Sequence, residues 1–560
     1  MIQAPESFAD LPPDFVDEDP GIRPVIQITT EIHNVISEAC QALSNDRNVF
    51  CRGPILVDVV RATEADADSF VPIGGPRIRT IPSATMRERL TRCAMFQVFD
   101  GRRKKDPWKP AIPSDHVVHG VVSRGEYPMI RPILGVLEAP SMRPDGTIIQ
   151  KRGYDHRTGY LYEPSTDFPE VPENPTQAEA TKALAEVFEA FADFPFAIEA
   201  GRSAAVAGLL SIIARPAITG AVPAFIVDAS TRGTGKSLTT DVIGTIATGR
   251  ATSKMSWPAD DVELEKVLGA YAMQGANIVN FDNVVRRFGG GPLDRCLTAT
   301  DTVELRVLGK TDVPAVLWRA VVLATGNNID LSGDTSRRVL MIRLESPLEH
   351  PEDRCDFKHP DLLRWCVENR GRLVVAALTV LRAWFVAGKP KASTKRWGSF
   401  EAWSDLVPAA IVHAGGADPM GARPAMTEQE EPEKVALLGL LDHLPRFCNG
   451  SGGVTARDLQ QALYPAGGRR RDEPPDGWDN LREAIEGLCW VKSGQTPTSK
   501  AIGNGFKRYR RRVVAGKRLD SRSIQGGIYV WYVSNPQGIP VVKNTQDCGS
   551  IDENTQNDAQ

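Results

Sequence analysis

The chain has 560 residues, of which 42% are apolar and 24% are charged, and its formal net charge is −4 at pH 7. These values are typical of a folded globular protein, and the length is sufficient for three or four domains. They exclude a chain that attracts nucleic acid through its overall charge, so basic regions have to be sought one by one.

The cysteines and the chain start bear on the cellular compartment. None of the nine cysteines lies in a close Cys-x-x-Cys pair, which argues against a disulfide framework or a zinc site and favours a reducing environment. The acidic, proline-bearing start has neither the basic lead nor the apolar core of a signal peptide, and no uncharged apolar run approaches the length of a membrane span. We therefore expect a cytoplasmic protein without a membrane partner.

The first third of the chain predicts an α+β domain. Residues 1–20 are acidic and are expected to be disordered, and residues 21–170 carry short apolar runs broken by Gly and Pro. Turn-forming residues at 144–146 (Pro-Asp-Gly) and 157–159 (Arg-Thr-Gly) predict two hairpins within this domain.

A helical lead-in precedes a strand, a glycine loop and a helix. Thr176 and Glu179 form a capping-box pattern that starts one helix, and a second helix is expected to stop at Pro216. The six residues 224–229 then predict a buried parallel strand. We expect residues 171–345 to hold this lead-in and a P-loop ATPase domain of α/β fold.

The loop after this strand has the composition of a phosphate-binding loop. Backbone N–H groups of a glycine turn at a helix N-terminus converge on phosphate, which the helix dipole also favours. In this pattern Lys236 reaches the β- and γ-phosphates of ATP and the Ser237 hydroxyl binds Mg²⁺. The pattern departs at Ser230, where the full motif has glycine. The predicted ATP-binding residues are Arg232, Gly233, Thr234, Gly235, Lys236 and Ser237.

A second apolar strand, at residues 277–285, carries Asp282 as the expected second magnesium ligand. The next residue is Asn283, where many such ATPases have a glutamate that polarises the attacking water. An amide cannot act as a base. Three alternatives remain: water oriented by hydrogen bonds, a carboxylate elsewhere such as Glu263, or slow hydrolysis.

A third apolar strand ends in polar residues that include Asn327, and the amide at this end of the sheet is expected to hold water or the γ-phosphate. Arg337 and Arg338 precede a further strand, and one of them is expected to act on a neighbouring subunit's ATP as an arginine finger. Between the second and third strands a predicted hairpin carries Arg306 and Lys310 near its tip, where they would contact a DNA backbone.

Four elements in this order carry a family resemblance: STRGTGKS, IVNFDNV, the basic hairpin, and LATGNN followed by GDTSRR. Together they resemble the superfamily 3 helicases of the AAA+ class, especially primase-helicase-like replication proteins of phages and integrated mobile elements. The resemblance implies that Asn327 is the sensor, that the hairpin contacts DNA, and that Arg337 or Arg338 acts in trans within a hexamer. No convincing primase centre is apparent before residue 170, so the chain is interpreted as the helicase half.

Beyond this core we expect a helical lid or collar at residues 346–415, a linker at 416–433, a winged-helix DNA-binding domain at 434–534 and a disordered tail at 535–560. A basic run between residues 500 and 522, interpreted as lying on a helix, is the expected duplex-binding surface. Its predicted DNA contacts are Lys507, Arg508, Arg510, Arg511 and Arg512.

These observations predict an ATP-dependent DNA helicase or replication initiator that uses ATP and Mg²⁺ and works as a homo-oligomeric ring. An ATP-driven switch or loader that binds DNA without unwinding it remains an alternative, and Asn283 is the feature that motivates it. A third alternative is the helicase part of a larger primase-helicase.

Overall fold

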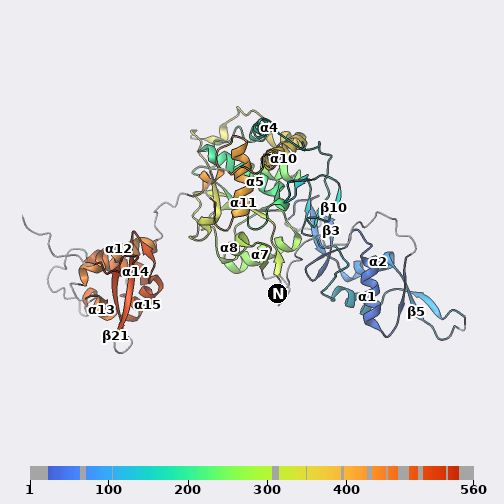
Figure 1. The fold of residues 1–560 in the computed structure, drawn as a ribbon, viewed down its shortest axis with the longest axis horizontal. Helices are drawn as coiled ribbons and strands as arrows, with labels where there is room; N and C mark the ends of the chain where they lie inside the picture. The colour runs from blue at the N-terminus through green and yellow to red at the C-terminus, as the bar shows by residue number, and fades with distance from the viewer. Residues whose placement is uncertain are drawn as a thin grey trace, which may run out of the picture. The chain divides into compact units, whose positions relative to one another are not determined.

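The computed structural model describes residues 23–63, 71–103, 105–305, 315–348, 350–391, 396–424, 432–448, 452–464, 478–489, 496–524 and 528–541. The chain divides into two compact units, Met1–Pro424 and Ala425–Gln560, and both mix helices with strands (Figure 1). The predicted disordered start, residues 542–560 of the predicted tail, and the hairpin tip with Arg306 and Lys310 lie outside the described residues. The prediction of disorder is wrong for the first residues of the tail, because Pro540 bridges to Ser534 and Val541 packs against the core of the second unit.

A five-stranded parallel sheet forms the centre of the first unit. Its strands run in the order β13 (Lys254–Met255), β14 (Ile278–Val284), β17 (Val321–Asn327), β12 (Ala224–Ala229) and β18 (Val339–Leu344). All six residues of β12 are buried, as expected for a parallel sheet covered on both faces. The predicted strand at 224–229 is confirmed, and β17 separates it from β14.

Helices cover both faces of this sheet because alternate strand residues face opposite sides. Phe225 and Val227 of β12 pack into one apolar cluster, whereas Ala224 and Ile226 pack into the other. Figure 1 shows α7 and α8 together, apart from α4, α5, α10 and α11. The first cluster is covered by α4 (Gln177–Glu189), α5 (Glu199–Ile213), α6 (Lys236–Thr248), α9 (Leu362–Glu368), α10 (Arg370–Val386) and α11 (Glu401–His413), and the second by α7 (Asp261–Gln274) and α8 (Gly291–Thr298).

Several local predictions are confirmed in this unit. The capping box of Thr176 and Glu179 is present at the start of α4. Helix α5 ends at Ile213, and the short helix η2 (Arg215–Ala217) contains the expected stop, Pro216. Strands β15 (Thr302–Glu304) and β16 (Ala315–Leu317) pair antiparallel as the base of the predicted hairpin.

The expected linker at 416–433 begins inside the first unit. Residues of η5 (Pro419–Ala422) are buried and pack on α5 and β18. The remaining short helices are η3 (Thr335–Arg338), which precedes β18, and η4 (Pro351–Asp353), which follows it.

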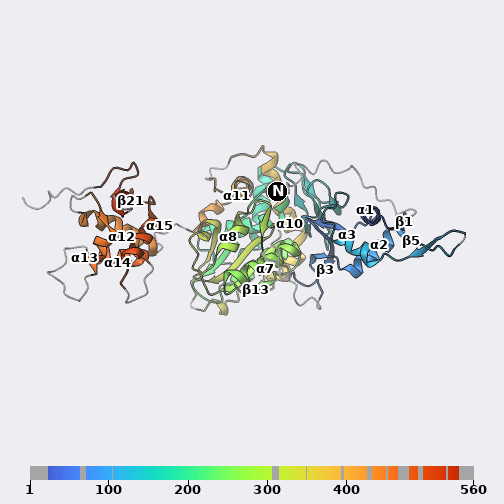
Figure 2. The ribbon, with the colours of Figure 1, turned by 90° about the horizontal axis from the view of Figure 1, so that it is seen from below.

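The N-terminal part of this unit contains small sheets with three helices. Strands β1 (Val25–Ile28), β5 (Met95–Phe99) and β6 (Trp108–Ala111) form one sheet, and β2 (Phe50–Arg52), β3 (Ile55–Arg61) and β4 (Pro76–Thr80) form another. Figure 2 also shows β5 near α1 and α2. The helices are α1 (Ile32–Leu43), α2 (Ser83–Cys93) and α3 (Asp115–Val122), and the further strands are β7 (Gly135–Leu137), β8 (Ser141–Met142), β9 (Ile148–Ile149), β10 (Gly153–Asp155) and β11 (Tyr160–Tyr162).

The two hairpins predicted at 144–146 and 157–159 are confirmed, because β8 pairs with β9 and β10 with β11 in antiparallel register. A buried arginine, Arg52, joins the N-terminal part to the central sheet. Its guanidinium donates to the carbonyl oxygens of Leu134 at 3.2 Å, Ala272 at 2.8 Å and Leu317 at 3.2 Å. Residues Ala272 and Leu317 belong to α7 and to the base of the β15–β16 hairpin, so one side chain ties three segments together.

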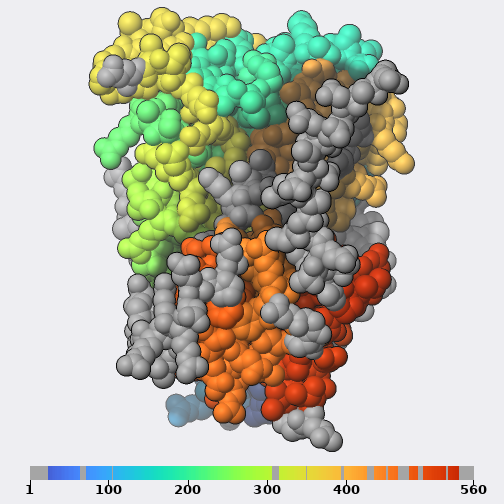
Figure 3. Space-filling model, turned by 90° about the vertical axis from the view of Figure 1, so that its left-hand side faces the viewer, coloured from blue at the N-terminus to red at the C-terminus, as the bar shows by residue number. Residues whose placement is uncertain are grey.

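The described residues of the second unit form four helices and an antiparallel sheet in the order β19, β22, β21, β20. In the space-filling view, the red atoms of its last described residues gather along one side (Figure 3). Its elements are α12 (Pro432–Phe447), β19 (Val454–Thr455), α13 (Ala456–Leu463), α14 (Trp478–Cys489), α15 (Ser499–Tyr509), β20 (Val513–Val514), β21 (Lys517–Ile524) and β22 (Ile528–Ser534).

The interpretation of the basic run as a single helix is wrong in part. Helix α15 ends at Tyr509, Arg511 has the left-handed φ of 66°, and β21 begins at Lys517. The buried Tyr509 and Leu519 anchor the chain on both sides of this turn, so tertiary packing ends the helix inside a run of good helix formers.

Candidate nucleotide site

The loop between β12 and α6 has the backbone of an anion-binding turn. Gly233 and Gly235 have φ values of 74° and 91°, a region that glycine enters without the steric penalty of a Cβ atom. Helix α6 begins directly afterwards at Lys236, so its free backbone N–H groups and the positive end of its dipole lie at the loop. The arrangement suits a phosphate group.

Lys236 lies across this loop. Its ammonium donates to the Thr231 carbonyl oxygen at 2.9 Å and to Thr234 Oγ1 at 3.3 Å. Partial burial lowers the pKa of Lys236, and the negative charges of Asp228 and Asp282 oppose this shift. The loop therefore holds one cation close to two carboxylates.

Asp282 meets the start of α6. Ser237 donates from Oγ to Asp282 Oδ1 at 2.7 Å, and Thr325 Oγ1 of the neighbouring strand β17 donates to the same oxygen at 2.7 Å. The two predicted magnesium ligands, Ser237 and Asp282, are thus hydrogen-bonded to each other, whereas Thr325 was missed as a partner of Asp282. Its position at the end of an adjacent parallel strand was the available signal.

The oxygens of Ser237 and Asp282 fit a magnesium ion, which prefers hard oxygen ligands and takes only one or two carboxylates when phosphates and water complete its shell. No group of three or more His, Cys, Asp or Glu side chains that could hold a metal occurs in the described part of the chain. An ion here would depend on oxygens from the nucleotide and water.

Asn283 follows Asp282 in the left-handed region, with a φ of 53°, and its backbone N–H donates to Thr325 Oγ1 at 3.0 Å. Asparagine tolerates this backbone better than most residues. Glu263, the alternative base, is ion-paired with Lys266 at 3.1 Å in the exposed first turn of α7.

Asn327 is the exposed last residue of β17 and is in register with Ala229, the residue that precedes the loop. The turn after it is fixed by a network that the sequence did not reveal. The Asp228 carboxylate accepts from the backbone N–H of Ile329 at 3.1 Å and pairs with Arg343, whose guanidinium also donates to Asn328 Oδ1 at 3.0 Å. Asp228 and Arg343 therefore hold the turn that presents Asn327.

Arg337 and Arg338 lie at the N-terminal end of the parallel strands, opposite the end that carries the glycine loop. Strand β18 is parallel to β12, and its first residue, Val339, is in register with Ala224. The six residues of β12 rise ~3.3 Å each, so the start of the strand lies ~20 Å from the loop at its end. Neither arginine can therefore reach the phosphate loop of its own chain.

The two arginines differ in their contacts. Arg338 pairs with Asp294 at 2.8 Å and donates to the Asp334 carbonyl oxygen at 3.0 Å. Arg337 is exposed, and its guanidinium makes no hydrogen bond or ion pair with any residue that the structure describes. Of these two arginines, Arg337 is the one whose guanidinium has no hydrogen-bond or ion-pair partner among the described residues.

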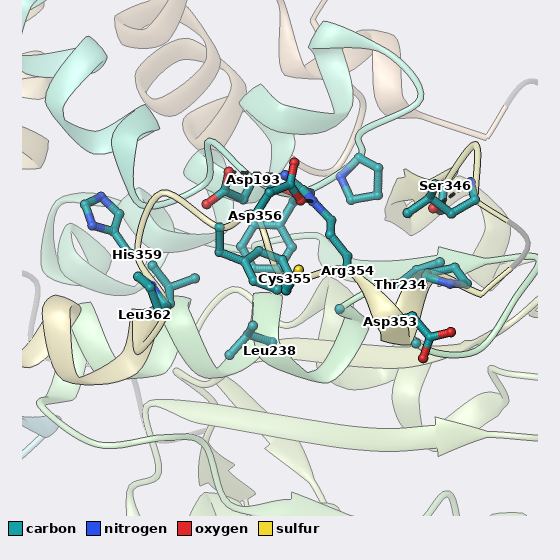
Figure 4. A pocket seen from close by; sticks show the side chains of 18 of the residues that line it. Asp193, Thr234, Leu238, Ser346, Asp353, Arg354, Cys355, Asp356, His359 and Leu362 are labelled. Carbon is teal, nitrogen blue, oxygen red and sulfur yellow. Dashed lines mark hydrogen bonds and ion pairs between the residues drawn. The ribbon is translucent and has the colours of Figure 1, made fainter.

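A cavity of about 770 Å³ opens beside the glycine loop. Thr234 and Leu238 line it from the loop and α6, while Asp193 precedes α5 (Figure 4). Arg354 extends into it and donates to the Asp193 carbonyl oxygen at 2.6 Å and to Asp356 Oδ1 at 2.8 Å. The sequence did not predict this cavity, because its walls come from segments about 160 residues apart.

The predicted DNA contacts in the second unit are all exposed. The Lys507 ammonium lies 5.0 Å from the ring centroid of Tyr529 on β22, which brings α15 and the β21–β22 hairpin together. Arg508 and Arg512 lie 5.7 and 6.0 Å from the ring of Tyr509. The set Lys507, Arg508, Arg510, Arg511 and Arg512 thus spans the end of α15 and the following turn.

No protein-family model matches the chain, and no curated protein matches it. The solved structures to which the chain is similar include the apo form of the NrS-1 C-terminal region, with 13% identity, a TM-score of 0.33, and coverage of 80% of this chain and 97% of that one. They also include a structure described as "SCCmec type IV Cch - active helicase", with 10% identity, a TM-score of 0.32, and coverage of 88% and 98%.

A third is the X-ray structure of JCV helicase, with 13% identity, a TM-score of 0.19, and coverage of 43% and 67%. Similarities with these TM-scores do not identify the function of this chain. Among the described helices, none is both long and apolar enough to cross a membrane.

Proposed function

We propose that the chain binds Mg²⁺ and ATP at the β12–α6 loop and hydrolyses the nucleotide. The observation that carries this proposal is the 2.7 Å hydrogen bond between Ser237 and Asp282 at the mouth of the glycine loop. A hydroxyl at a helix start and a carboxylate from a neighbouring parallel strand are the two protein ligands that a P-loop NTPase uses for magnesium. Bound there, the metal would neutralise charge on the transferred phosphoryl group.

In this assignment the phosphates lie at Gly233 to Ser237, and the base and sugar extend into the cavity beside Leu238 and Arg354. Lys236 would exchange its contacts with Thr231 and Thr234 for phosphate oxygens. Asn327 is placed to hold the attacking water or the γ-phosphate, because its strand ends beside Ala229.

The same geometry supports hydrolysis between subunits. The Arg337 guanidinium makes no hydrogen bond or ion pair with a described residue, and Arg337 lies at the end of β18 remote from the glycine loop of its own chain. An arginine in such a position can stabilise the transition state only on another chain. We assign Arg337, rather than Arg338, as the finger of a ring-shaped oligomer for which six subunits are expected.

Coupled to DNA, such a ring is an ATP-dependent helicase or replication initiator of the kind used by phages and mobile elements. The β15–β16 hairpin would contact a single strand through Arg306 and Lys310, and the basic residues of α15 and its following turn would bind duplex. A winged-helix role for the second unit agrees with its order of helices and its β21–β22 hairpin.

The direct test is Lys236→Ala. We expect it to abolish DNA-stimulated ATP turnover, measured as phosphate release, while duplex binding by the second unit stays within about twofold of the wild type. Lys182→Ala, an exposed lysine on α4, is the matched control and should leave turnover unchanged. Unchanged turnover in Lys236→Ala would refute the site assignment.

A second candidate is an ATP-driven switch or loader, and Asn283 favours it because the position after Asp282 lacks a carboxylate. A strand-displacement assay on a forked duplex separates the two. The helicase releases the labelled strand with ATP, whereas the switch binds DNA and turns over ATP without releasing it.

A further inference from the structure

The small sheet of β1, β5 and β6 has one face covered and one face open. Ile26 of β1 and Phe96 of β5 point into the core shared with α1, α2 and α3, where both are almost fully buried. Because side chains alternate along a strand, the residues between them face the other side. In the described part of the chain, no element covers that second face.

The open face carries large apolar and aromatic side chains. Val25, Met95 and Phe99 are 46%, 39% and 59% exposed, and they lie on β1 and β5 in the alternation that leaves Ile26 and Phe96 buried. Phe99 is opposite Trp108 of β6, and their ring centroids are 5.6 Å apart in an edge-to-face arrangement. We call the four residues Val25, Met95, Phe99 and Trp108 the aromatic face.

The loop joining β5 to β6 is basic. Between Asp100 and Lys109 the sequence has five basic and two acidic residues. Arg102, Arg103 and Lys105 are exposed, and Asp100, the acidic residue nearest the strand, is ion-paired with Lys109 at 3.4 Å. Positive charge is therefore concentrated directly beyond the Phe99–Trp108 pair, on a chain whose net charge is negative.

The β6 edge of this sheet is closed to strand addition. Strand β6 is the edge strand next to the basic loop, and it contains Pro110, which has no backbone N–H, beside the exposed Lys109. Proline and lysine on an edge strand disfavour pairing with another chain. A ligand that contacts Trp108 and the basic loop would therefore lie on the face of the sheet and not along the β6 edge.

We propose that the aromatic face and the three exposed cations Arg102, Arg103 and Lys105 form a binding site for single-stranded nucleic acid. Exposed rings on an open sheet stack with unpaired bases, and adjacent cations bind the phosphates between them. The site is separate from the nucleotide loop, the β15–β16 hairpin and the second unit. Duplex is excluded as the preferred ligand because its bases are stacked on one another and cannot reach Phe99 and Trp108.

The three exposed cations favour nucleic acid over an apolar protein surface as the ligand of this site. An apolar partner surface would need the rings but would gain nothing from three exposed cations at the same end of the sheet. A polyanion with flat apolar groups matches both features, and unpaired nucleic acid is such a ligand.

The test uses the full chain without nucleotide and fluorescein-labelled oligomers, 20 residues of dT or U, in an anisotropy titration. Phe99→Ala combined with Trp108→Ala should weaken binding by roughly tenfold or more, since stacking on an aromatic ring is worth ~1–3 kcal/mol per base. Arg102→Ala combined with Arg103→Ala should lower the slope of log K against log salt by about 1.4. Comparing the affinities for dT and U oligomers shows whether the site prefers DNA or RNA.

Matched controls come from the same unit. Ile73→Ala removes a side chain that is 63% exposed elsewhere, and Arg364→Ala with Arg396→Ala removes two exposed arginines. Neither control should change the affinity, and a 20-base-pair duplex should bind all variants equally.

Cross-linking locates the strand directly. A dT oligomer containing 4-thiothymidine, irradiated on the full chain, should label the peptide that contains Phe99 and Trp108. Labelling confined to other peptides, together with unchanged affinity of the Phe99–Trp108 double variant, would overturn the proposal. This outcome is independent of the ATPase assignment, because Lys236→Ala should leave both the affinity and the cross-link intact.

Discussion

Arg337 and Arg338 are adjacent in the sequence, yet their side chains have different contacts in the structure. Arg338 holds Asp294, whose side chain is 17% exposed and which also accepts from Thr335 Oγ1 at 2.9 Å. Burial raises the pKa of Asp294, and the bonds from Thr335 and Arg338 oppose that shift. Arg337 contributes nothing to this cluster through its side chain.

We therefore expect one alanine variant to lose ATP turnover and the other to lose stability. Arg337→Ala should lower ATP turnover by roughly 10³-fold, the effect of losing an arginine finger, with an unchanged melting temperature. Arg338→Ala should lower the melting temperature. Equal loss of turnover in both variants, with equal stability, would contradict the assignment.

The Arg338→Ala variant should also show a defined pH dependence. Without Arg338 the pKa of Asp294 rises further, so the native state favours the protonated carboxyl. Stability from such a group is present at low pH and is lost as the pH rises through the native pKa. The difference in melting temperature from the wild type should be larger at pH 8 than at pH 5, and thermal unfolding at both pH values measures it.

Cys355 offers a probe of the cavity. It lines the cavity and is the one cysteine that is exposed among the eight in the described residues. With Cys548 replaced by Ser, we expect N-ethylmaleimide to modify Cys355 first, and Mg-ATP analogue to slow the reaction at least fivefold. A labelling rate that does not respond to the nucleotide would place the base outside this cavity.

At the scale of elements, predictions succeeded where the signal was local. The strand at 224–229 and helix α6 follow from apolar periodicity on either side of a glycine loop. Ser237 and Asp282 meet because parallel strands end at a common side of the sheet, and their role as magnesium ligands stays a prediction. The order of the sheet did not follow, because the insertion of β17 between β12 and β14 depends on long-range pairing.

Other features lacked any sequence signal. The aromatic face was missed because the sequence of β5, Met-Phe-Gln-Val-Phe, is apolar at positions facing both sides, and only the packing of Phe96 against the helices shows which side is open. The end of α15 was misplaced because helix propensity does not register the packing of Tyr509 and Leu519.

Helix α6 depends on a distant side chain at its C-terminal end. The buried Arg370 donates to the carbonyl oxygens of Ile246 at 3.0 Å and Ala247 at 2.9 Å, and also to that of Glu138 at 3.0 Å. Burial lowers the pKa of Arg370 to about 10, although Glu138 opposes the shift. The carbonyl oxygens in the last turn of a helix have no backbone N–H donor within that helix, and Arg370 supplies donors for two of them in α6.

Arg370→Met should therefore destabilise the first unit by about 3 kcal/mol or more, because it leaves buried carbonyl oxygens without donors. Differential scanning calorimetry should show a lower transition for the first unit and an unchanged transition for the second. Arg372→Met, on the same helix but 42% exposed, is the control. A shift of the same size in the control would show that the carbonyl contacts are unimportant.

At the scale of the whole molecule, the proposed finger role of Arg337 would make the active site a property of two chains. A mixture of Lys236→Ala and Arg337→Ala proteins should regain part of the ATP turnover that each lacks alone. In the mixed oligomer, an intact loop of the Arg337→Ala chain meets an intact arginine of the Lys236→Ala chain. Phosphate release that stays at the level of the separate variants would exclude action between subunits.

Arg52 has a mechanical consequence. Its buried guanidinium bonds a carbonyl oxygen on α7, one at the foot of the β15–β16 hairpin and one in the N-terminal part. Separating these segments would leave a charge stranded in the interior, which is strongly unfavourable. We therefore expect α7, the base of the β15–β16 hairpin and the segment around Leu134 to move together, so that a force on the hairpin base is transmitted to the N-terminal part through Arg52.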